Sequence, residues 1–106
     1  MKTEKSEKFY GDPRYYQLLQ KMKETYSIKN HDYASNKDPM SNFKECEEIG
    51  VDAFRGVLVR MSDKWSRIRQ LTSKGTNLVK DESIEDTLKD LAVYALIAIL
   101  LHRDRR

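Results

Sequence analysis

Apolar residues recur at helical spacing in three long stretches of the chain, and no stretch alternates polar and apolar residues over the length of a strand. The first stretch begins at Asp12-Pro13, where an aspartate precedes a proline at the first helical position. Its apolar residues are Tyr15, Leu18, Leu19, Met22 and Tyr26. We expect this helix to end near Ser27, because segment 30–36 is polar and turn-prone.

Two further helices are predicted in the middle of the chain. Asp38-Pro39 is a second start signal, for a short helix that reaches about Ile49 and is ended by Gly50. A long helix should then cover residues 52–72. Its apolar stripe is made of Phe54, Val57, Leu58, Met61, Trp65 and Ile68. Because Trp65 belongs to this stripe, we expect it in the core.

The last helix should run from Glu82 or Ser83 to about Leu101, and its second half is apolar on every side. Three other helices, one of them short, cannot cover such a helix completely. The sequence therefore predicts an all-α protein, a compact bundle of three longer helices plus one short helix. It also predicts a homo-oligomer, most simply a two-fold dimer, with the last helix buried in or beside the interface.

The length of 106 residues predicts a polar arm at 1–11 followed by a single domain at 12–106. Cys46 is the only cysteine and no signal-peptide pattern is present, so a cytoplasmic location is expected. The longest apolar run, 91–101, is about half of what a bilayer requires. The net charge of +3 is concentrated at the chain ends, without a basic stripe interleaved with aromatic residues. These features argue against a membrane or a nucleic acid as partner.

Three carboxylates, Glu82, Asp86 and Asp90, repeat at four-residue spacing on one face of the last helix. Like charges so placed repel one another by roughly 0.2–0.5 kcal/mol per pair, which favours a bound cation such as Mg²⁺. Acidic residues in a first turn also complement the helix dipole, and this is the alternative explanation. It does not account for Asp90, which lies in the third turn.

Two other groups could recognise a ligand. Arg60, Lys64 and Arg67 lie at the rim of an apolar stripe and suit phosphate oxygens, although pairing with Asp63 is the alternative. The second group lies in a predicted polar loop and just after it, and offers donors, acceptors and rings to a base or sugar: His31, Asp32, Tyr33, Asn42 and Phe43. The alternative for His31 is an ordinary surface histidine. Carboxylates holding a metal beside basic residues would form a triphosphate site.

Three blocks of sequence then suggest a family: HDYASNKDPMSNF, RMSDKWSRIRQL and DESIEDTLKDLAVYA. In this order they resemble the phage and bacterial nucleotide-modification-associated domain of all-α type. That domain is similar in turn to the MazG-like and all-α dUTPase superfamily of nucleoside triphosphate pyrophosphohydrolases. If the chain is phage-encoded, its location would be the host cytoplasm.

The resemblance implies a Mg²⁺ site on the last helix. MazG-like enzymes carry an ExxE pair on one helix and an ExxD pair on the next. Glu82 and Glu85 fit the first pattern by type, and Asp86 and Asp90 add carboxylates on the same helix, whereas the preceding helix has no such pair. Asp63, Asp32 or a second subunit would have to complete the metal shell.

The favoured hypothesis is a Mg²⁺-dependent enzyme that hydrolyses a (deoxy)nucleoside triphosphate to monophosphate and pyrophosphate. Glu82, Asp86 and Asp90 would hold the metal. The cations Arg60, Lys64 and Arg67 would neutralise the leaving group, and the polar residues around Asp32 would orient sugar and base. The alternatives are a non-catalytic phage protein that sequesters a nucleotide as an oligomer, and a small interaction protein whose charged stripes are solvated surface.

Overall fold

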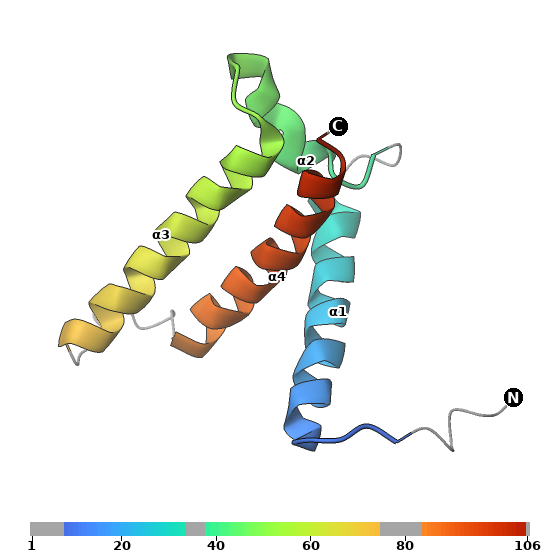
Figure 1. Cartoon of the computed structure of the whole chain (residues 1–106), viewed down its shortest axis with the longest axis vertical. Helices are drawn as coiled ribbons and strands as arrows, with labels where there is room; N and C mark the ends of the chain where they lie inside the picture. Colours follow the sequence, from blue (N-terminus) through green and yellow to red (C-terminus); the bar gives the residue numbers. More distant parts are fainter. Residues whose placement is uncertain (1–7, 34–37, 75–83, 106) are drawn as a thin grey trace, which may run out of the picture.

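The computed structural model describes residues 8–33, 38–74 and 84–105, and over these ranges it contains helices and no strand (Figure 1). The elements are α1 (Pro13–Tyr33), α2 (Ser41–Lys44), the 3-10 helix η2 (Glu45–Ile49), α3 (Ala53–Lys74) and α4 (Ile84–Arg103). The predicted all-α class is confirmed. Helices α3 and α4 lie side by side and antiparallel, and α1 runs along the other side of α4. None of the helices in the described part of the chain is long and apolar enough to cross a membrane.

Helix α1 continues to Tyr33, so the predicted end near Ser27 is wrong. No glycine or proline interrupts the chain between these residues. The half-buried positions Met22, Tyr26 and Asn30 continue one stripe at four-residue spacing. Asn30 Nδ2 also donates a hydrogen bond of 2.8 Å to the carbonyl of Pro39. A polar residue thus anchors the last turns of α1 to the segment that leads into α2.

The short helical segment ends at Ile49 as predicted, divided between α2 and η2. The Asp38 carboxylate accepts a hydrogen bond of 2.9 Å from the backbone N–H of Met40, just before α2. Gly50 has a φ of +88°, a left-handed conformation that favours glycine, and it ends η2. The Asp52 carboxylate accepts a bond of 3.2 Å from the backbone N–H of Arg55 and so starts α3.

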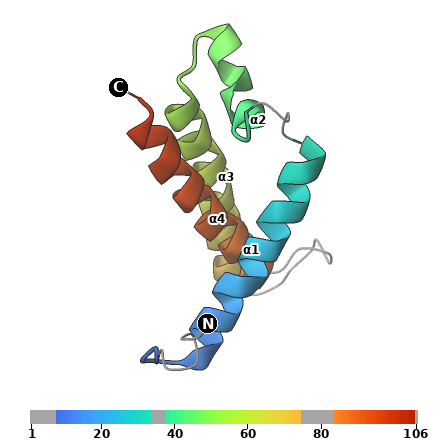
Figure 2. The ribbon, with the colours of Figure 1, turned by 90° about the vertical axis from the view of Figure 1, so that its right-hand side faces the viewer.

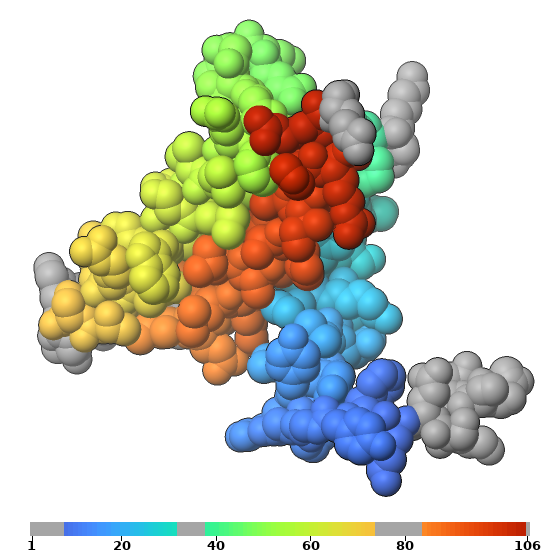
Figure 3. Space-filling model, viewed as in Figure 1, coloured from blue at the N-terminus to red at the C-terminus, as the bar shows by residue number. Residues whose placement is uncertain are grey.

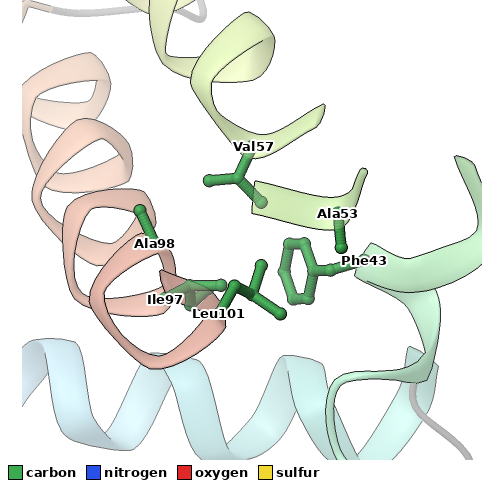
Figure 4. Packing of buried hydrophobic residues seen from close by; sticks show 6 residues of the cluster. All are labelled: Phe43, Ala53, Val57, Ile97, Ala98 and Leu101. Atoms are coloured by element: carbon green, nitrogen blue, oxygen red, sulfur yellow. The ribbon is translucent and has the colours of Figure 1, made fainter. Parts of the chain in front are cut away.

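The core lies where α2, the first turns of α3 and the last turns of α4 meet (Figure 4). Its buried members point toward one another from the three helices: Phe43, Ala53, Val57, Ile97, Ala98 and Leu101. Val57 is the most completely enclosed of them, at 1% exposure. The contact between α3 and α4 continues beyond this core, since Ile68 in the second half of α3 and Thr87 near the start of α4 are also buried.

The predicted burial of Trp65 is wrong, since the structure leaves 54% of this residue exposed. Helix α3 packs along α4, and it meets α2 and η2 only over its first turns. A single neighbouring helix covers a narrow arc, centred on Val57 and Ile68, which are buried. Trp65 and Leu58 lie roughly 80–100° around the helix from Val57 and fall at the edge of this arc.

The helices do not form the predicted compact bundle: Figure 2 shows α1 inclined to α4, with the ends of these two helices that lie nearest α2 well apart (Figures 1 and 2). The radius of gyration is 16.8 Å, against about 13 Å for a compact chain of this length. The first half of α1, residues 13–21, is exposed on all sides. In the described chain, Tyr26 is the one residue of α1 that packs against the core, whereas α3 and α4 pack along each other.

Gly56 in α3 allows η2 to pass close to the helix. A Cβ at this position would lie 2.7 Å from Cys46 Sγ, closer than real Cβ contacts, while the Cys46 Cβ would be at an ordinary 3.8 Å. The clash therefore involves the sulfur alone, and an alanine at position 46 would remove it.

We expect Gly56→Ala to destabilise the wild-type chain by about 1 kcal/mol through overpacking. In a Cys46→Ala background the same change should stabilise by about 0.5–1 kcal/mol, because alanine is the better helix former. Urea unfolding of the four chains forms a double-mutant cycle that measures both values. An effect of the same sign in both backgrounds would contradict the assigned contact.

Candidate functional site

A cleft of about 610 Å³ lies between α1 and α4, and residues of α2 and Arg60 of α3 also line it. Most of its polar lining is charged, and aromatic rings make up part of the remainder. The charged and amide residues are Lys21, Lys29, Arg60, Lys89, Asp86, Asp90, Asn30 and Asn42. The rings are Tyr26, Phe43 and Tyr94.

Helical periodicity explains why α1 presents these groups together. Lys21, Thr25 and Lys29 form one row at four-residue spacing, and Met22, Tyr26 and Asn30 form the adjacent row. The second row is half-buried, whereas the two lysines lie at the exposed rim. The cations of α1 are therefore held beside an apolar and aromatic wall.

Only two of the predicted acidic residues of α4 line the cleft among those that the structure describes. Asp86 and Asp90 line the cleft from successive turns of α4. Glu85 is not among the residues that line the cleft. Its side chain is 74% exposed, and its Oε2 atom lies 3.1 Å from Lys89 Nζ in an ion pair. Glu82 lies outside the described residues. Within the described ranges, no group of three or more acidic, histidine or cysteine side chains is close enough together to hold a metal.

Of the three cations predicted on α3, only Arg60 lines the cleft. Arg60 lines the cleft, and Lys64 Nζ lies 3.1 Å from Asp90 Oδ2. The Lys64 and Asp90 side chains are 23% and 38% exposed, so this ion pair is partly shielded from water. Arg67 lies two turns beyond Arg60 and is not among the residues that line the cleft. The acids of α4 and the cations of α3 thus meet directly at Lys64 and Asp90.

Phe43 belongs to the core and is also one of the rings that line the cleft. Only 9% of the residue is exposed. The Arg60 guanidinium lies over one ring face, 5.0 Å from the centroid, and Tyr94 packs edge-on at 6.4 Å. Phe43 therefore positions Arg60. Tyr26 and Tyr94 are the half-buried rings that face the cleft.

The polar loop predicted around His31 is instead the last turn of α1. His31 is exposed and does not line the cleft. The side chains of Asp32 and Tyr33 lie outside what the structure describes. Asn42 does line the cleft, and its Oδ1 is buried without a hydrogen-bond partner among the described residues.

The start of α2, which carries Asn42 and Phe43, is held by Asp38. The hydrogen bond from the Met40 N–H lowers the pKa of Asp38 below its usual value, and Lys44 lowers it further. Lys44 Nζ lies 3.0 Å from Asp38 Oδ2, and this carboxylate raises the pKa of Lys44. Both groups are charged at neutral pH and fix the first turn of α2.

Sequence reasoning missed Lys21, Lys29 and Lys89 as cleft residues. All three lie on polar positions of amphipathic helices, where charged residues are ordinarily solvated. The eight-residue separation of Lys21 and Lys29 was the available signal, because it places both on one face. Which neighbour that face meets depends on the packing of α1 against α4.

The cleft thus combines an apolar and aromatic wall with four cations and two carboxylates. Residues 50–101 match a family described as nucleotide modification associated domain 1. The match covers just under half of the chain and includes Arg60, Lys64, Asp86 and Asp90. It supports the predicted resemblance to that domain over α3 and most of α4. Searches of curated proteins and of solved structures found no match to this chain.

Proposed function

We propose that the chain binds a nucleotide in the cleft between α1 and α4 together with Mg²⁺. The reaction proposed for it is hydrolysis of a (deoxy)nucleoside triphosphate to monophosphate and pyrophosphate. One observation carries the proposal: four cations and two carboxylates from three helices line a single cleft. The family match adds weight, because its description concerns nucleotide modification.

The cations suit a polyphosphate. Lys21 and Lys29 line the cleft from α1, Lys89 lines it from α4, and Arg60 lines it from α3. A triphosphate spreads several negative charges over a chain of oxygens, so cations on opposite walls can contact it together. Arg60 can bind two phosphate oxygens through its planar guanidinium, whereas a lysine acts as a point charge.

The carboxylates fit Mg²⁺ by chemistry and number. Mg²⁺ in nucleotide sites is commonly held by one or two carboxylates, with phosphate oxygens and water completing the shell. Asp86 and Asp90 face the same cleft one helical turn apart, and Glu82 is the further ligand that the sequence suggests. When bound there, the ion would polarise the phosphate and lower the pKa of the attacking water. Lys64 would orient Asp90 through its ion pair.

The second candidate is a binding protein that captures a nucleotide without hydrolysing it. The observation that favours it is the Lys64–Asp90 pair, because Lys64 already neutralises one of the two carboxylates of the cleft. The remaining charge is positive and would hold a phosphate without a metal. Analysis of the products after incubation with deoxynucleoside triphosphates and Mg²⁺ separates the two candidates.

Nucleotide binding should appear as a rise in melting temperature with nucleoside triphosphates, larger with Mg²⁺ than without it. Lys29→Met, which removes a cleft cation, should weaken binding by about fivefold, as expected for an interaction worth about 1 kcal/mol. Lys23→Met is the matched control, because Lys23 is an exposed lysine of α1 outside the cleft. Absence of a shift with every nucleotide tested, or equal losses in the two variants, would overturn the proposal.

A further inference from the structure

The part of the cleft next to α2 presents amides and rings. Asn42 and Phe43 belong to α2 itself, and the ring of Tyr94 packs edge-on against Phe43 at 6.4 Å. From α1, Asn30 reaches the carbonyl of Pro39, two residues before α2 begins. We call this part of the cleft the α2 region and define it by four lining residues, Tyr26, Asn30, Asn42 and Tyr94.

The two carboxylates of the cleft lie on another stretch of α4. Asp86 and Asp90 belong to its first two turns, and Tyr94 follows Asp86 by about 12 Å along the helix axis. Figure 3 shows the first turns of α4 (orange) far from the green segment that contains α2 and η2, whereas its last turns (red) lie near that segment. A nucleotide whose phosphates lie at Asp86 and Asp90 therefore directs its base toward the α2 region.

Asn30 can offer this base an oxygen, because its nitrogen is already engaged. Its Nδ2 donates a hydrogen bond of 2.8 Å to the carbonyl of Pro39 and lies 3.4 Å from the hydroxyl of Tyr26. A backbone carbonyl only accepts hydrogen bonds, so this contact fixes which way the Asn30 amide faces. The amide oxygen is thus the atom that Asn30 presents to a ligand.

Asn42 offers a second amide oxygen to the base. Asn42 lines the cleft, and its Oδ1 is buried without a partner among the described residues. Buried polar atoms are as a rule hydrogen-bonded, so a ligand donor is the partner that this oxygen lacks. The terminal torsion of an asparagine side chain has broad preferences, and a rotation about it turns the oxygen toward the cleft.

We propose that the α2 region selects a base that carries an exocyclic amino group, as cytosine and adenine do. This inference rests on the proposed function, because it requires that a nucleotide binds in the cleft. The N–H bonds of the amino group can donate to the amide oxygens of Asn30 and Asn42. A ring carbonyl at the same position, as in uracil and hypoxanthine, would place an acceptor against an acceptor. Tyr26 and Tyr94 provide rings on which the base can stack.

Two pairs of nucleotides test the preference in the wild-type chain. Deoxycytidine and deoxyuridine triphosphates differ at this one group, and so do deoxyadenosine and deoxyinosine triphosphates. As α,β-imido analogues, which resist the proposed cleavage, the amino member of each pair should bind at least about tenfold more tightly. Isothermal titration calorimetry with Mg²⁺ measures the four affinities. Equal affinities within each pair would overturn this inference alone, whereas no binding of any analogue would also overturn the proposed function.

Asn42→Leu tests the residue that reads the amino group. Leucine removes the amide at similar size and leaves the bond between Asn30 and Pro39 in place. The variant should bind the two amino analogues about tenfold more weakly and the other two almost as the wild type does. Loss of structure would instead weaken all four equally, and circular dichroism verifies that the helices are retained.

Gln70→Leu is the matched control, because Gln70 is an exposed amide of α3 that is not among the residues lining the cleft. It should keep all four affinities and the preference. A preference that survives undiminished in Asn42→Leu, or an equal loss of all four affinities in it, would overturn the assignment to Asn42.

Discussion

Replacing Phe43 with alanine should lower the free energy of unfolding by about 3–4 kcal/mol, the largest stability loss that we expect from any single substitution in the chain. Phe43 joins α2 to α3 and α4 in a core that has few fully buried members. Its removal would leave a cavity beside Val57 and Leu101, which the other members of so small a core cannot fill (Figure 4). It would also withdraw the ring on which Arg60 rests.

Urea unfolding followed by circular dichroism measures this loss, and Phe9→Ala provides the matched control. Phe9 is 68% exposed and contacts only the ring of Tyr16 among the aromatic residues of the described chain, so its loss should cost about 0.5 kcal/mol or less. Phe43→Leu should keep most of the stability while losing the cation–π contact with Arg60. Similar losses for Phe43→Ala and Phe9→Ala would contradict the position of the core.

The helices themselves were predictable, because their apolar periods and start signals are local. The Asp38-Pro39 signal and Gly50 delimit α2 and η2 as expected. The end of α1 was not predictable, since Asn30 is held by the carbonyl of Pro39, nine residues later in the chain. A hydrogen bond between separate segments leaves no periodic signal in either of them.

The degree of burial was harder to predict than helix position. Trp65 lies on an apolar stripe, but only α4 covers that side of α3, and the buried arc is centred on Val57 and Ile68 and does not include Trp65. The apolar stripe shows which face of a helix is buried; the number of neighbouring helices decides how wide the buried arc is.

The spacing of residues along the sequence predicted part of the candidate site, whereas the rest depends on how the helices pack against one another. The four-residue step from Asp86 to Asp90 places both acids on one face of α4, and both line the cleft. Glu85 precedes Asp86 directly in the sequence, so it projects from a different side of the helix and does not line the cleft. The contact of Arg60 with one face of the Phe43 ring depends on how α2 packs against α3, and the spacing of residues could not predict it.

Replacing either cleft carboxylate by its amide should have the largest effect on the proposed reaction. Asp86→Asn and Asp90→Asn should each lower triphosphate turnover at least about 100-fold, because each removes an anionic oxygen proposed to hold Mg²⁺. Nucleotide binding without Mg²⁺ should persist or strengthen, since the cleft loses one negative charge. The gain in melting temperature that Mg²⁺ adds to the nucleotide should disappear. Pyrophosphate release and thermal shifts, each with and without Mg²⁺, measure these effects.

The two variants should differ in one respect that depends on Lys64. Asp90→Asn removes the partner of Lys64, so this ammonium group becomes available to phosphate and metal-free binding should strengthen more than in Asp86→Asn. Glu48→Gln is the charge-matched control, because Glu48 is exposed on η2 and does not line the cleft. Unchanged turnover in both cleft variants would remove the assignment of Asp86 and Asp90 to the metal. Retained nucleotide binding without turnover in the wild-type chain would favour the capture function, in which Lys64 competes with a metal for Asp90.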